Sequence, residues 1–508
     1  MESWLETPRL NKPAAVFVVS VVGVVFIQLA RILRQVFRRR ELGRLHGCEK
    51  LPNENDRFRY DFFGIAKTIE LASHFQRRTS LMYTNALFTR YGETYASHLI
   101  GYRLIFTHNR ENIQHLLSTA FVDFDSSPLR KPLFQSITPH GIFTLDGADW
   151  KKRRGQLNGR LSDLRRIIDL EGCERHFQAF LQHVPPNSQA FDIQSCVFAL
   201  SLDIQTGLSL GESIDALDPC QPPEKKQFEA DLLHVKERIV QDGFRGPLRH
   251  WRSKRTFVQS CRRAREYVMA QATREVRQRS HQKEKAGVHP VRAALDAEAE
   301  EISQFTDQAL SILLANDSIG TTLSGLFYCL SQDERVVRKL RASITDTIGL
   351  TPPTWKQLGS LGYVRCVVQE VMRLFPAVVL NARVANKDSI MPSGGGRDGD
   401  APALVRAGDI VVFSTWARHR LGNDFGEDPQ AFYPERWEHL SGDMPGYIPF
   451  NKGPRACPGR HYAMVILTYL VARLFQTYSR VSNYNTQPWT EKISMTFEND
   501  NGVFVGLS

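Results

Sequence analysis

The distribution of apolar residues divides the chain into a short N-terminal segment and a long body. Residues 14–30 form an uncharged apolar run, and residues 302–330 and 462–475 have the apolar spacing of buried helices. Segments 94–99 and 103–107 alternate with the two-residue period of strands, which predicts a β-hairpin. Elsewhere in the body, the apolar residues mostly recur with the period of a helix. The pattern therefore predicts a mainly α body with small β-sheets.

The N-terminal apolar run is long enough to cross a membrane. At ~1.5 Å per residue, a helix over residues 14–30 covers about 25 Å, close to the thickness of a bilayer core. Positive charge behind the run predicts the N-terminus outside and the body in the cytosol. A cleaved signal peptide would need its charge in front and a small-residue cleavage site behind, and the sequence shows neither. The arginines behind the run are Arg31, Arg34, Arg38, Arg39, Arg40 and Arg44.

Composition and net charge narrow the possible binding partners and the cellular compartment of the chain. The 508 residues are 42% hydrophobic and carry a net charge of +11, which fits a nucleic-acid or a membrane surface. The arginines behind the apolar run favour the membrane, so we expect no nucleic-acid binding. Eight irregularly placed cysteines without a Cys-x-x-Cys pair suit a reducing compartment. Because no linker or repeat divides the body, we expect an anchor with a basic linker over residues 1–46 and one domain over residues 47–508.

The most informative stretch is Phe-Asn-Lys-Gly-Pro-Arg-Ala-Cys-Pro-Gly at residues 450–459. Gly453 and Gly459 can adopt backbone angles that other residues resist, so the chain can curl around Cys457. Arg455 places a cation two residues from this sulfur. A metal ligand must be thiolate, and a single thiolate is the ligand used where haem iron cleaves O–O bonds. A buried structural cysteine, the alternative, would not explain the glycines, the arginine and the phenylalanine together.

This pattern, Phe-x-x-Gly-x-Arg-x-Cys-x-Gly, resembles the haem-binding loop of the cytochrome P-450 superfamily of haem-thiolate monooxygenases. The resemblance implies that Cys457 is the axial thiolate of a haem b iron. It also implies that Phe450, Arg455 and Gly459 belong to the cofactor-binding loop. The fold implied is a cytochrome P-450-type domain over residues 47–508, preceded by one N-terminal transmembrane helix.

Two further positions match cofactor ligands of the resembled family. Trp150 and Arg154 are four residues apart and share a helix face. In the family this Trp-x-x-x-Arg motif donates hydrogen bonds to a haem propionate, and Arg383 matches a second propionate ligand. Lys151 and Lys152, on the same helix, are either a solvated face or part of a docking surface for an acidic electron donor.

The apolar helix predicted over residues 302–330 has a polar centre, where buried ionisable groups are usually paired, hydrated or functional. The resembled family has a small-Gly-x-acid-Thr-Thr pattern here. Aligned on it, Ala315 takes the glycine position, Asp317 the acid and Ser318 the alcohol. Asp317 and Ser318 would then relay protons to dioxygen. Serine replaces the family's threonine, and Thr321, three residues on, is the alternative alcohol.

Glu370 and Arg373 lie one helical turn apart, a spacing that most often marks a surface ion pair. Arg436, in the segment 432–437, lies between them and the cysteine loop. This is the order in which the family assembles a Glu-Arg-Arg core. The resemblance therefore implies that the three residues form a buried structural triad.

Local strings at residues 47–48, 141–147 and 447–453 resemble the fungal branch that hydroxylates alkanes and fatty acids. The implied function is a membrane-anchored monooxygenase that inserts one oxygen atom into a hydrophobic small molecule. Its electrons would come from NADPH through a separate chain, NADPH-cytochrome P-450 reductase. We expect a monomer in the endoplasmic reticulum membrane, with a single pass and the catalytic domain facing the cytosol.

The substrate stays open at this point. A fatty acid or alkane-like chain is favoured, and a polyketide or terpenoid intermediate of fungal secondary metabolism is the alternative. A haem-thiolate isomerase or dehydratase, or a haem protein without catalysis, would not need the proton relay that Asp317 and Ser318 are expected to form. The sequence does not identify the oxidised carbon.

Overall fold

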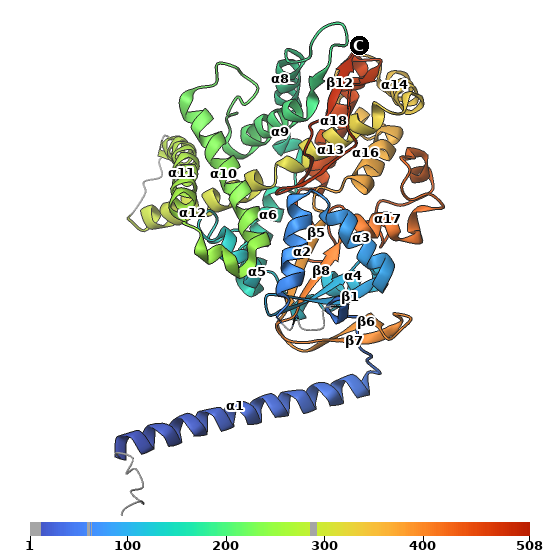
Figure 1. The fold of residues 1–508 in the computed structure, drawn as a ribbon. Helices are drawn as coiled ribbons and strands as arrows, with labels where there is room; N and C mark the ends of the chain where they lie inside the picture. The colour runs from blue at the N-terminus through green and yellow to red at the C-terminus, as the bar shows by residue number, and fades with distance from the viewer. Residues whose placement is uncertain (1–11, 58–60, 62, 285–291) are drawn as a thin grey trace, which may run out of the picture.

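The computed structural model describes residues 12–57, 61, 63–284 and 292–508 (Figure 1). The helices are α1 (Lys12–Leu45), α2 (Ile65–Gln76), α3 (Ser80–Tyr91), α4 (Arg110–Gln114), α5 (Ser127–Phe134), α6 (Gly147–Arg160), α7 (Leu164–Ile167), α8 (Leu170–Leu181), α9 (Ile193–Leu210), α10 (Pro223–Arg245), α11 (Arg255–Glu284), α12 (Arg292–Leu314), α13 (Asp317–Leu330), α14 (Glu334–Ile348), α15 (Trp355–Leu358), α16 (Gly362–Leu374), α17 (Thr415–Leu421) and α18 (Arg460–Thr477). The strands are β1 (Thr94–Leu99), β2 (Tyr102–Thr107), β3 (Phe124–Asp125), β4 (Phe191–Asp192), β5 (Leu380–Ala385), β6 (Ser389–Gly395), β7 (Ala401–Val405), β8 (Ile410–Ser414), β9 (Val481–Asn483), β10 (Glu491–Ile493), β11 (Phe497–Asn499) and β12 (Phe504–Leu507).

The largest sheet lies on the side of the body nearest α1 and has the order β1-β2-β8-β5-β3. Strands β1 and β2 form the hairpin expected from the alternating pattern, with Thr94 opposite Thr107. Strand β8 pairs parallel to β2 and antiparallel to β5, which brings residues 306 positions apart, such as Leu104 and Ile410, into one sheet. The mainly α fold with small sheets is thus confirmed.

The main core is helical and is built around α9, α13, α16 and α18. These helices bury apolar side chains such as Phe327 and Leu470, as their spacing predicts. Two glycines on α13 allow close approach of its neighbours. A Cβ at Gly320 would stand 2.8 Å from the ring of Phe198, and one at Gly325 would stand 3.1 Å from Phe375.

The helix predicted over residues 302–330 is interrupted. It consists of α12 and α13, which are separated by a turn at Ala315 and Asn316. At the turn the amide of Ala315 bonds the carbonyl of Ile312, and the amide of Ile319 lies 3.4 Å from the carbonyl of Asn316. These bonds join residues three apart instead of four. The polar centre of the sequence pattern therefore marks a break, where backbone carbonyls need partners outside the helix.

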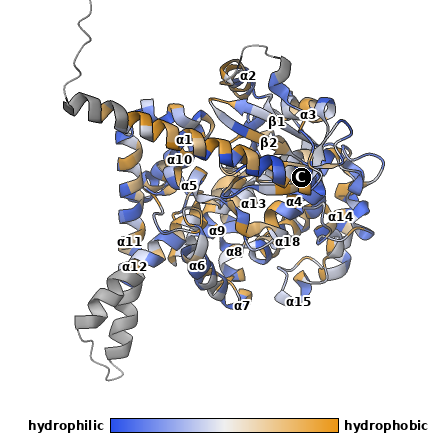
Figure 2. Cartoon of the chain, turned by 90° about the horizontal axis from the view of Figure 1, so that it is seen from below, coloured by the Kyte–Doolittle hydropathy of each residue, from blue (hydrophilic) through white to orange (hydrophobic). Residues whose placement is uncertain are grey.

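Helix α1 extends the apolar run into its basic flank without interruption. The stretch Ser20–Leu45 is 26 residues long and contains an 18-residue window with a mean hydropathy of 1.5, none of which is buried. By length and composition this helix can cross a membrane. Figure 2 shows apolar colouring along much of α1 and polar colouring near the body. The basic segment that the sequence suggested as a linker is therefore helical as far as Leu45.

The end of α1 is tied to the body by an ion pair. Arg39 donates to the carboxylate of Asp388 at 2.9 and 3.1 Å. Burial alone would raise the pKa of Asp388, but hydrogen bonds from Arg39 and from the amide of Ala407 bring this pKa below its ordinary value. Beyond α1, the amide of Glu49 bonds the carbonyl of Pro402 at 2.9 Å. The chain thus joins the β6–β7 hairpin before it enters the body.

Glu370 on α16 lies between two arginines. Arg373 donates to both carboxylate oxygens at 2.8 and 2.9 Å, and Arg436 donates from the short helix Pro434–Glu438 at 3.0 Å. Trp437 Nε1 adds a hydrogen bond at 2.9 Å. Both Glu370 and Arg373 are fully buried. The structure thus brings the three residues of the expected triad together.

We predict that Glu370→Gln lowers the free energy of unfolding by about 3–5 kcal/mol, because it leaves two buried guanidinium groups without their carboxylate. The matched control is Glu334→Gln, which removes a carboxylate whose side chain is 68% exposed and pairs with Arg338. The control should cost less than ~1 kcal/mol. Urea unfolding followed by circular dichroism measures both. Equal losses for the two variants would contradict a structural role for the buried pair.

Candidate functional site

Cys457 lies in a tight loop before α18. Its amide donates to the carbonyl of Phe450 at 2.8 Å, and the amide of Ala456 donates to the carbonyl of Gly453 at 3.0 Å. Cys457 is an exposed residue of the loop. Desolvation by the neighbouring protein raises the pKa of its thiol, while the amide of Gly459 and the charge of Arg154 lower it, and the net pKa lies above its ordinary value. The thiol is therefore protonated unless a metal replaces its proton.

The two loop glycines have different roles. Gly453 has a φ of +68°, and a Cβ there would collide with the carbonyl of Leu117. Gly459 has a φ of −87°, so the expectation that it needs an unusual backbone angle is wrong. A Cβ at Gly459 would stand 4.0 Å from the sulfur of Cys457. Its absence leaves open the space beside the sulfur, which suits a flat group lying close to the loop.

Four arginines gather between α5, α6, β5 and the cysteine loop. Arg455 donates to the carbonyl of Leu145 at 2.8 Å and to the carboxylate of Asp146. Arg130 and Arg383 both donate to Oδ1 of Asn381, at 3.1 and 3.2 Å. The fourth, Arg154, donates to the carbonyl of Ala456 and so joins α6 to the loop.

The charges of this cluster repel one another. Burial first, and then the neighbouring Arg130 and Arg455, lower the pKa of Arg383 to about 9. Burial and Arg455 likewise lower the pKa of Arg130 to about 10. In the part of the chain that the structure describes, Arg154 Nε and Arg383 Nε are buried and have no hydrogen-bond partner. Buried donors and crowded positive charge are costly unless an anionic group satisfies them.

The residues present fit a haem. The cluster offers buried guanidinium donors for two carboxylates, and Cys457 supplies one thiolate beside a glycine that leaves room for a flat ring. Trp150 is buried on the same side, where the guanidinium of Arg455 lies 4.3 Å from its ring centre. Sequence reasoning missed Arg130. Its segment has no motif, and only the fold brings α5 next to β5.

The arginine of the loop, Arg455, is not the cation that lowers the pKa of Cys457, and its expected part in cofactor binding stays a prediction. Arg455 directs its guanidinium toward Asp146 and Trp150. The cation that lowers the pKa of Cys457 is Arg154, four residues after Trp150 on α6. Arg455 is only two residues from Cys457 in the sequence, but this proximity does not make it the cation whose charge acts on the thiol.

On the distal side, Asp317 begins α13 and pairs with a lysine that sequence reasoning missed. Lys236 on α10 lies 2.7 Å from Oδ1 of Asp317 and 2.6 Å from Oδ1 of Asn316. The side chains of Lys236 and Asp317 are 8% and 14% exposed. The pair therefore ties α10 to the break between α12 and α13. The signal in the sequence was a lysine one helical turn from the apolar residues Leu232 and Ile239.

The two candidate alcohols differ in accessibility. Ser318 is partly exposed and donates to the carbonyl of Ala315 at 3.0 Å, and Ala315 itself is exposed. Thr321 is fully buried, and its hydroxyl has no hydrogen-bond partner among the described residues. Ala315 and Ser318 lie within one turn of each other, on the side of the helix break that remains accessible.

Comparison with known proteins decides the family, because the model for cytochrome P450 matches residues 62–501. The chain belongs to the cytochrome P450 family. Monooxygenase FPY7 of Fusarium mangiferae, a P450, is 30% identical over 92% of this chain and 91% of its own length. Cytochrome P450 52A12 of Debaryomyces hansenii is 29% identical over 87% of this chain and 88% of its own. Monooxygenase fsdH of Fusarium heterosporum is 28% identical over 98% of this chain and 90% of its own.

The family match confirms the resemblance drawn from residues 450–459 and the enzyme class, a P450 monooxygenase. Membership implies a haem-thiolate iron cofactor, which agrees with the arginine cluster and Cys457 of this P450. It also implies a redox partner and a hydrophobic substrate. The individual roles of Trp150, Arg154 and Arg383 in this P450 stay predictions.

We predict that Arg130→Gln speeds haem loss from the P450. A hydrogen bond to a charged group contributes about 1.5–3 kcal/mol, so the rate should rise about tenfold or more. Transfer of haem to apomyoglobin, followed by absorbance, measures the rate without any turnover. The matched control is Lys152→Gln, an exposed cation on α6, which should leave the rate unchanged. Equal rates for wild type and Arg130→Gln would remove Arg130 from the haem-binding cluster.

Proposed function

We propose that this P450 is a membrane-anchored monooxygenase that hydroxylates a long alkyl or acyl chain, with electrons from NADPH through a separate reductase. The observation that carries the proposal is the exposed apolar helix α1, joined by Arg39 and Asp388 to a body with one cysteine in a haem-type loop. The positive residues after residue 30 support a body on the cytosolic side, and we place the enzyme in the endoplasmic reticulum membrane.

The residues around the cysteine loop would hold and orient the cofactor. Cys457 would bind the iron through its sulfur, and Arg130, Arg154, Arg383 and Arg455 would hold the carboxylates of a haem. Trp150 packs beneath Arg455 and would shield these carboxylates from water. When bound, a haem with a thiolate ligand supplies the O–O cleavage that a monooxygenase needs.

On the distal side, Asp317 and Ser318 deliver protons. Ser318 Oγ is the accessible hydroxyl next to the helix break, and Asp317 lies beside it with its charge held by Lys236. Thr321 is less suitable, because it is buried. Such a relay is what a monooxygenase needs. A haem-thiolate isomerase or dehydratase needs none, which argues against that alternative.

We predict that Ser318→Ala keeps haem and substrate binding but diverts reducing equivalents, so that hydrogen peroxide formed per NADPH rises several-fold. The physical reason is the loss of a positioned proton donor at the break. Peroxide, product and NADPH consumption are measured in one reconstituted assay. Thr321→Ala is the matched control and should stay close to wild type. The opposite pattern would show that the alignment of the alcohol is three residues wrong.

The substrate class rests on apolar surface. Val378, next to β5, is 39% exposed. Phe121 lies in the segment before α6, and its ring centre is 5.7 Å from that of Trp150. Burying an alkyl chain yields about 25 cal/mol per Å2. The resemblance to the fungal alkane and fatty-acid hydroxylases supports the same class. The runner-up is a polyketide or terpenoid with an alkyl portion. It is favoured by Ser318 and Ile319, which stand where the family pattern has two threonines.

The test is the spin shift of the ferric enzyme on titration with long-chain fatty acids and alkanes. We expect micromolar type I shifts of the Soret band, followed by hydroxylation coupled to NADPH use. The type I shift is measured on the ferric enzyme with bound ligand, so the titration needs no reductase. No shift and no coupled NADPH use across the series would overturn the lipid proposal.

A further inference from the structure

Residues 135–146, called here the connecting segment, join α5 to α6 without regular secondary structure, yet much of their backbone is enclosed by the fold. Ile137 and Thr138 are fully buried, and the hydroxyl of Thr144 donates to the carbonyl of Thr138 at 2.6 Å. Buried backbone outside helices and strands needs hydrogen-bond partners from elsewhere in the fold. The partners of this segment come from two sides, from α11 and α12 at one end and from the cysteine loop at the other.

A buried carboxylate holds the first end of the connecting segment. Asp307 on α12 is 1% exposed and accepts a hydrogen bond from the amide of His140 at 2.7 Å. It also pairs with Arg265 of α11. Arg265 in turn donates to the carbonyl of Ile137 at 2.7 Å. One carboxylate and one guanidinium therefore bind the backbone of the segment at two points and hold it against both helices.

The segment also packs closely against α12. A Cβ at Gly141 would stand 2.6 Å from Oγ of Ser311, which lies one turn after Asp307. The hydroxyl of Ser311 is itself fixed, because it donates to the carbonyl of Asp307 at 2.6 Å. Ile312 packs against the apolar cluster that includes Ile142. The position of the segment on α12 is therefore set by packing as well as by charge.

The other end of the segment meets the arginine of the cysteine loop. Arg455 donates to the carbonyls of Ile142 and Leu145 at 3.3 and 2.8 Å, and it pairs with the carboxylate of Asp146. Among the described residues, every hydrogen-bond acceptor of Arg455 lies in the connecting segment. The direction in which Arg455 points is therefore decided by where this segment lies.

We propose that Asp307 is a positioning residue for the cofactor, which acts through the connecting segment. Asp307 fixes the backbone at His140, the segment then places its acceptors around Arg455, and Arg455 is thereby held in the arginine cluster. The inference rests on the proposed function, because it assumes that Arg455 holds a haem carboxylate. It adds a residue of α12 that orients this arginine from outside the cluster.

A second buried aspartate separates positioning from stability. Asp231 on α10 is 2% exposed and pairs with Arg263 of α11, two residues before Arg265. Both aspartates are thus buried carboxylates that bind an arginine of the same helix. Of the two, only Asp307 also accepts an amide of the connecting segment. Loss of either charge should weaken the packing of α11, whereas only loss of Asp307 should reach Arg455.

The test compares Asp307→Asn with Asp231→Asn in the holoenzyme. Both variants should unfold at lower urea concentration than wild type, since each leaves a guanidinium without its carboxylate. Only Asp307→Asn should speed the transfer of haem to apomyoglobin, by about tenfold, because Arg455 loses acceptors in fixed positions. Amide exchange followed by peptide mass spectrometry adds a readout of the backbone. Exchange over residues 137–146 should quicken in Asp307→Asn and stay as in wild type in Asp231→Asn.

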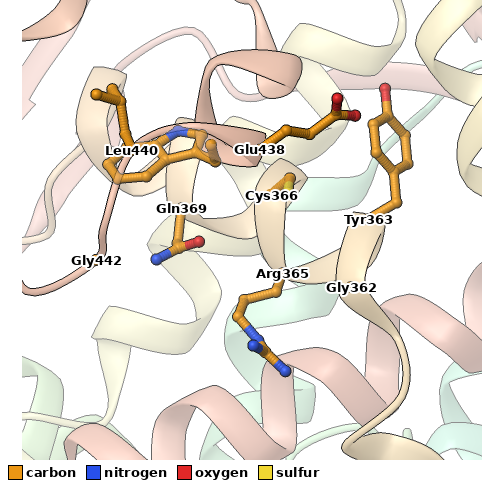
Figure 3. Close-up of a pocket in the computed structure, with 9 residues that line it drawn as sticks. Gly362, Tyr363, Arg365, Cys366, Gln369, Glu438, Leu440 and Gly442 are labelled. Atoms are coloured by element: carbon orange, nitrogen blue, oxygen red, sulfur yellow. The ribbon is translucent and has the colours of Figure 1, made fainter.

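The guanidinium that holds the segment is tested with its own control. Arg265→Gln removes the donor to the carbonyl of Ile137 and should also speed haem transfer. Arg365 likewise donates to a backbone carbonyl, that of Gly359 at 3.3 Å. It lies at the rim of a pocket of about 490 Å3 between the start of α16 and the segment after Trp437 (Figure 3). Arg365→Gln should match wild type, because this surface bond does not involve the connecting segment.

Equal haem-transfer rates for Asp307→Asn and Asp231→Asn, or unchanged exchange over residues 137–146, would overturn the proposal. If Asp307→Asn does not fold, Arg265→Gln decides between the same outcomes. Arg455→Gln separates this failure from that of the proposed function. Faster haem transfer in Arg455→Gln alone would leave the arginine cluster standing and remove Asp307 from its support. Unchanged transfer in both variants would show that Arg455 does not hold the cofactor.

Discussion

The buried carboxylate of Glu370 is the interaction on which the active-site loop depends. It holds Arg373 and Arg436, and Arg373 in turn donates to the carbonyl of His419 at 2.9 Å. His419 then accepts the amide of Ile448 at 2.9 Å, two residues before the cysteine loop begins. Burial and the nearby Arg373 keep the pKa of His419 well below its ordinary value, so the ring stays neutral and can accept that amide. One helix turn on α16 is thereby connected to the loop around Cys457.

Unlike the hydrogen bonds of Glu370, the arginine cluster lowers the stability of the fold. Arg130 and Arg383 lie in low-dielectric surroundings with like charges nearby, an arrangement that destabilises the chain by itself. An anionic ligand compensates such an arrangement, and the carboxylates of a haem would do so. Binding of the cofactor should therefore contribute to the stability of the folded state, because a ligand that binds only the native state stabilises it.

The distal side combines a buried charge with an irregularity of the backbone. The turn at Ala315 and Asn316 interrupts the helical hydrogen bonds, and Lys236 donates to the side chains of Asn316 in the turn and of Asp317 after it. Because Lys236 belongs to α10, a displacement of α10 would change the surroundings of Asp317. Helix α1, which is long and apolar enough to cross a membrane, and the β6–β7 hairpin that the chain joins after it lie outside this centre.

The sequence by itself determined the cysteine loop, the apolar N-terminal helix, the β1–β2 hairpin and the pairing of Glu370 with Arg373, because each depends on local spacing or on a motif of a few residues. Only the tertiary structure decided the break at Ala315, the contribution of Arg130, the pairing of Lys236 with Asp317, and which arginine meets the sulfur of Cys457. These features depend on contacts between segments far apart in the chain, where helix packing selects the partner. Sequence periodicity describes each element alone, and it does not contain the distances between elements.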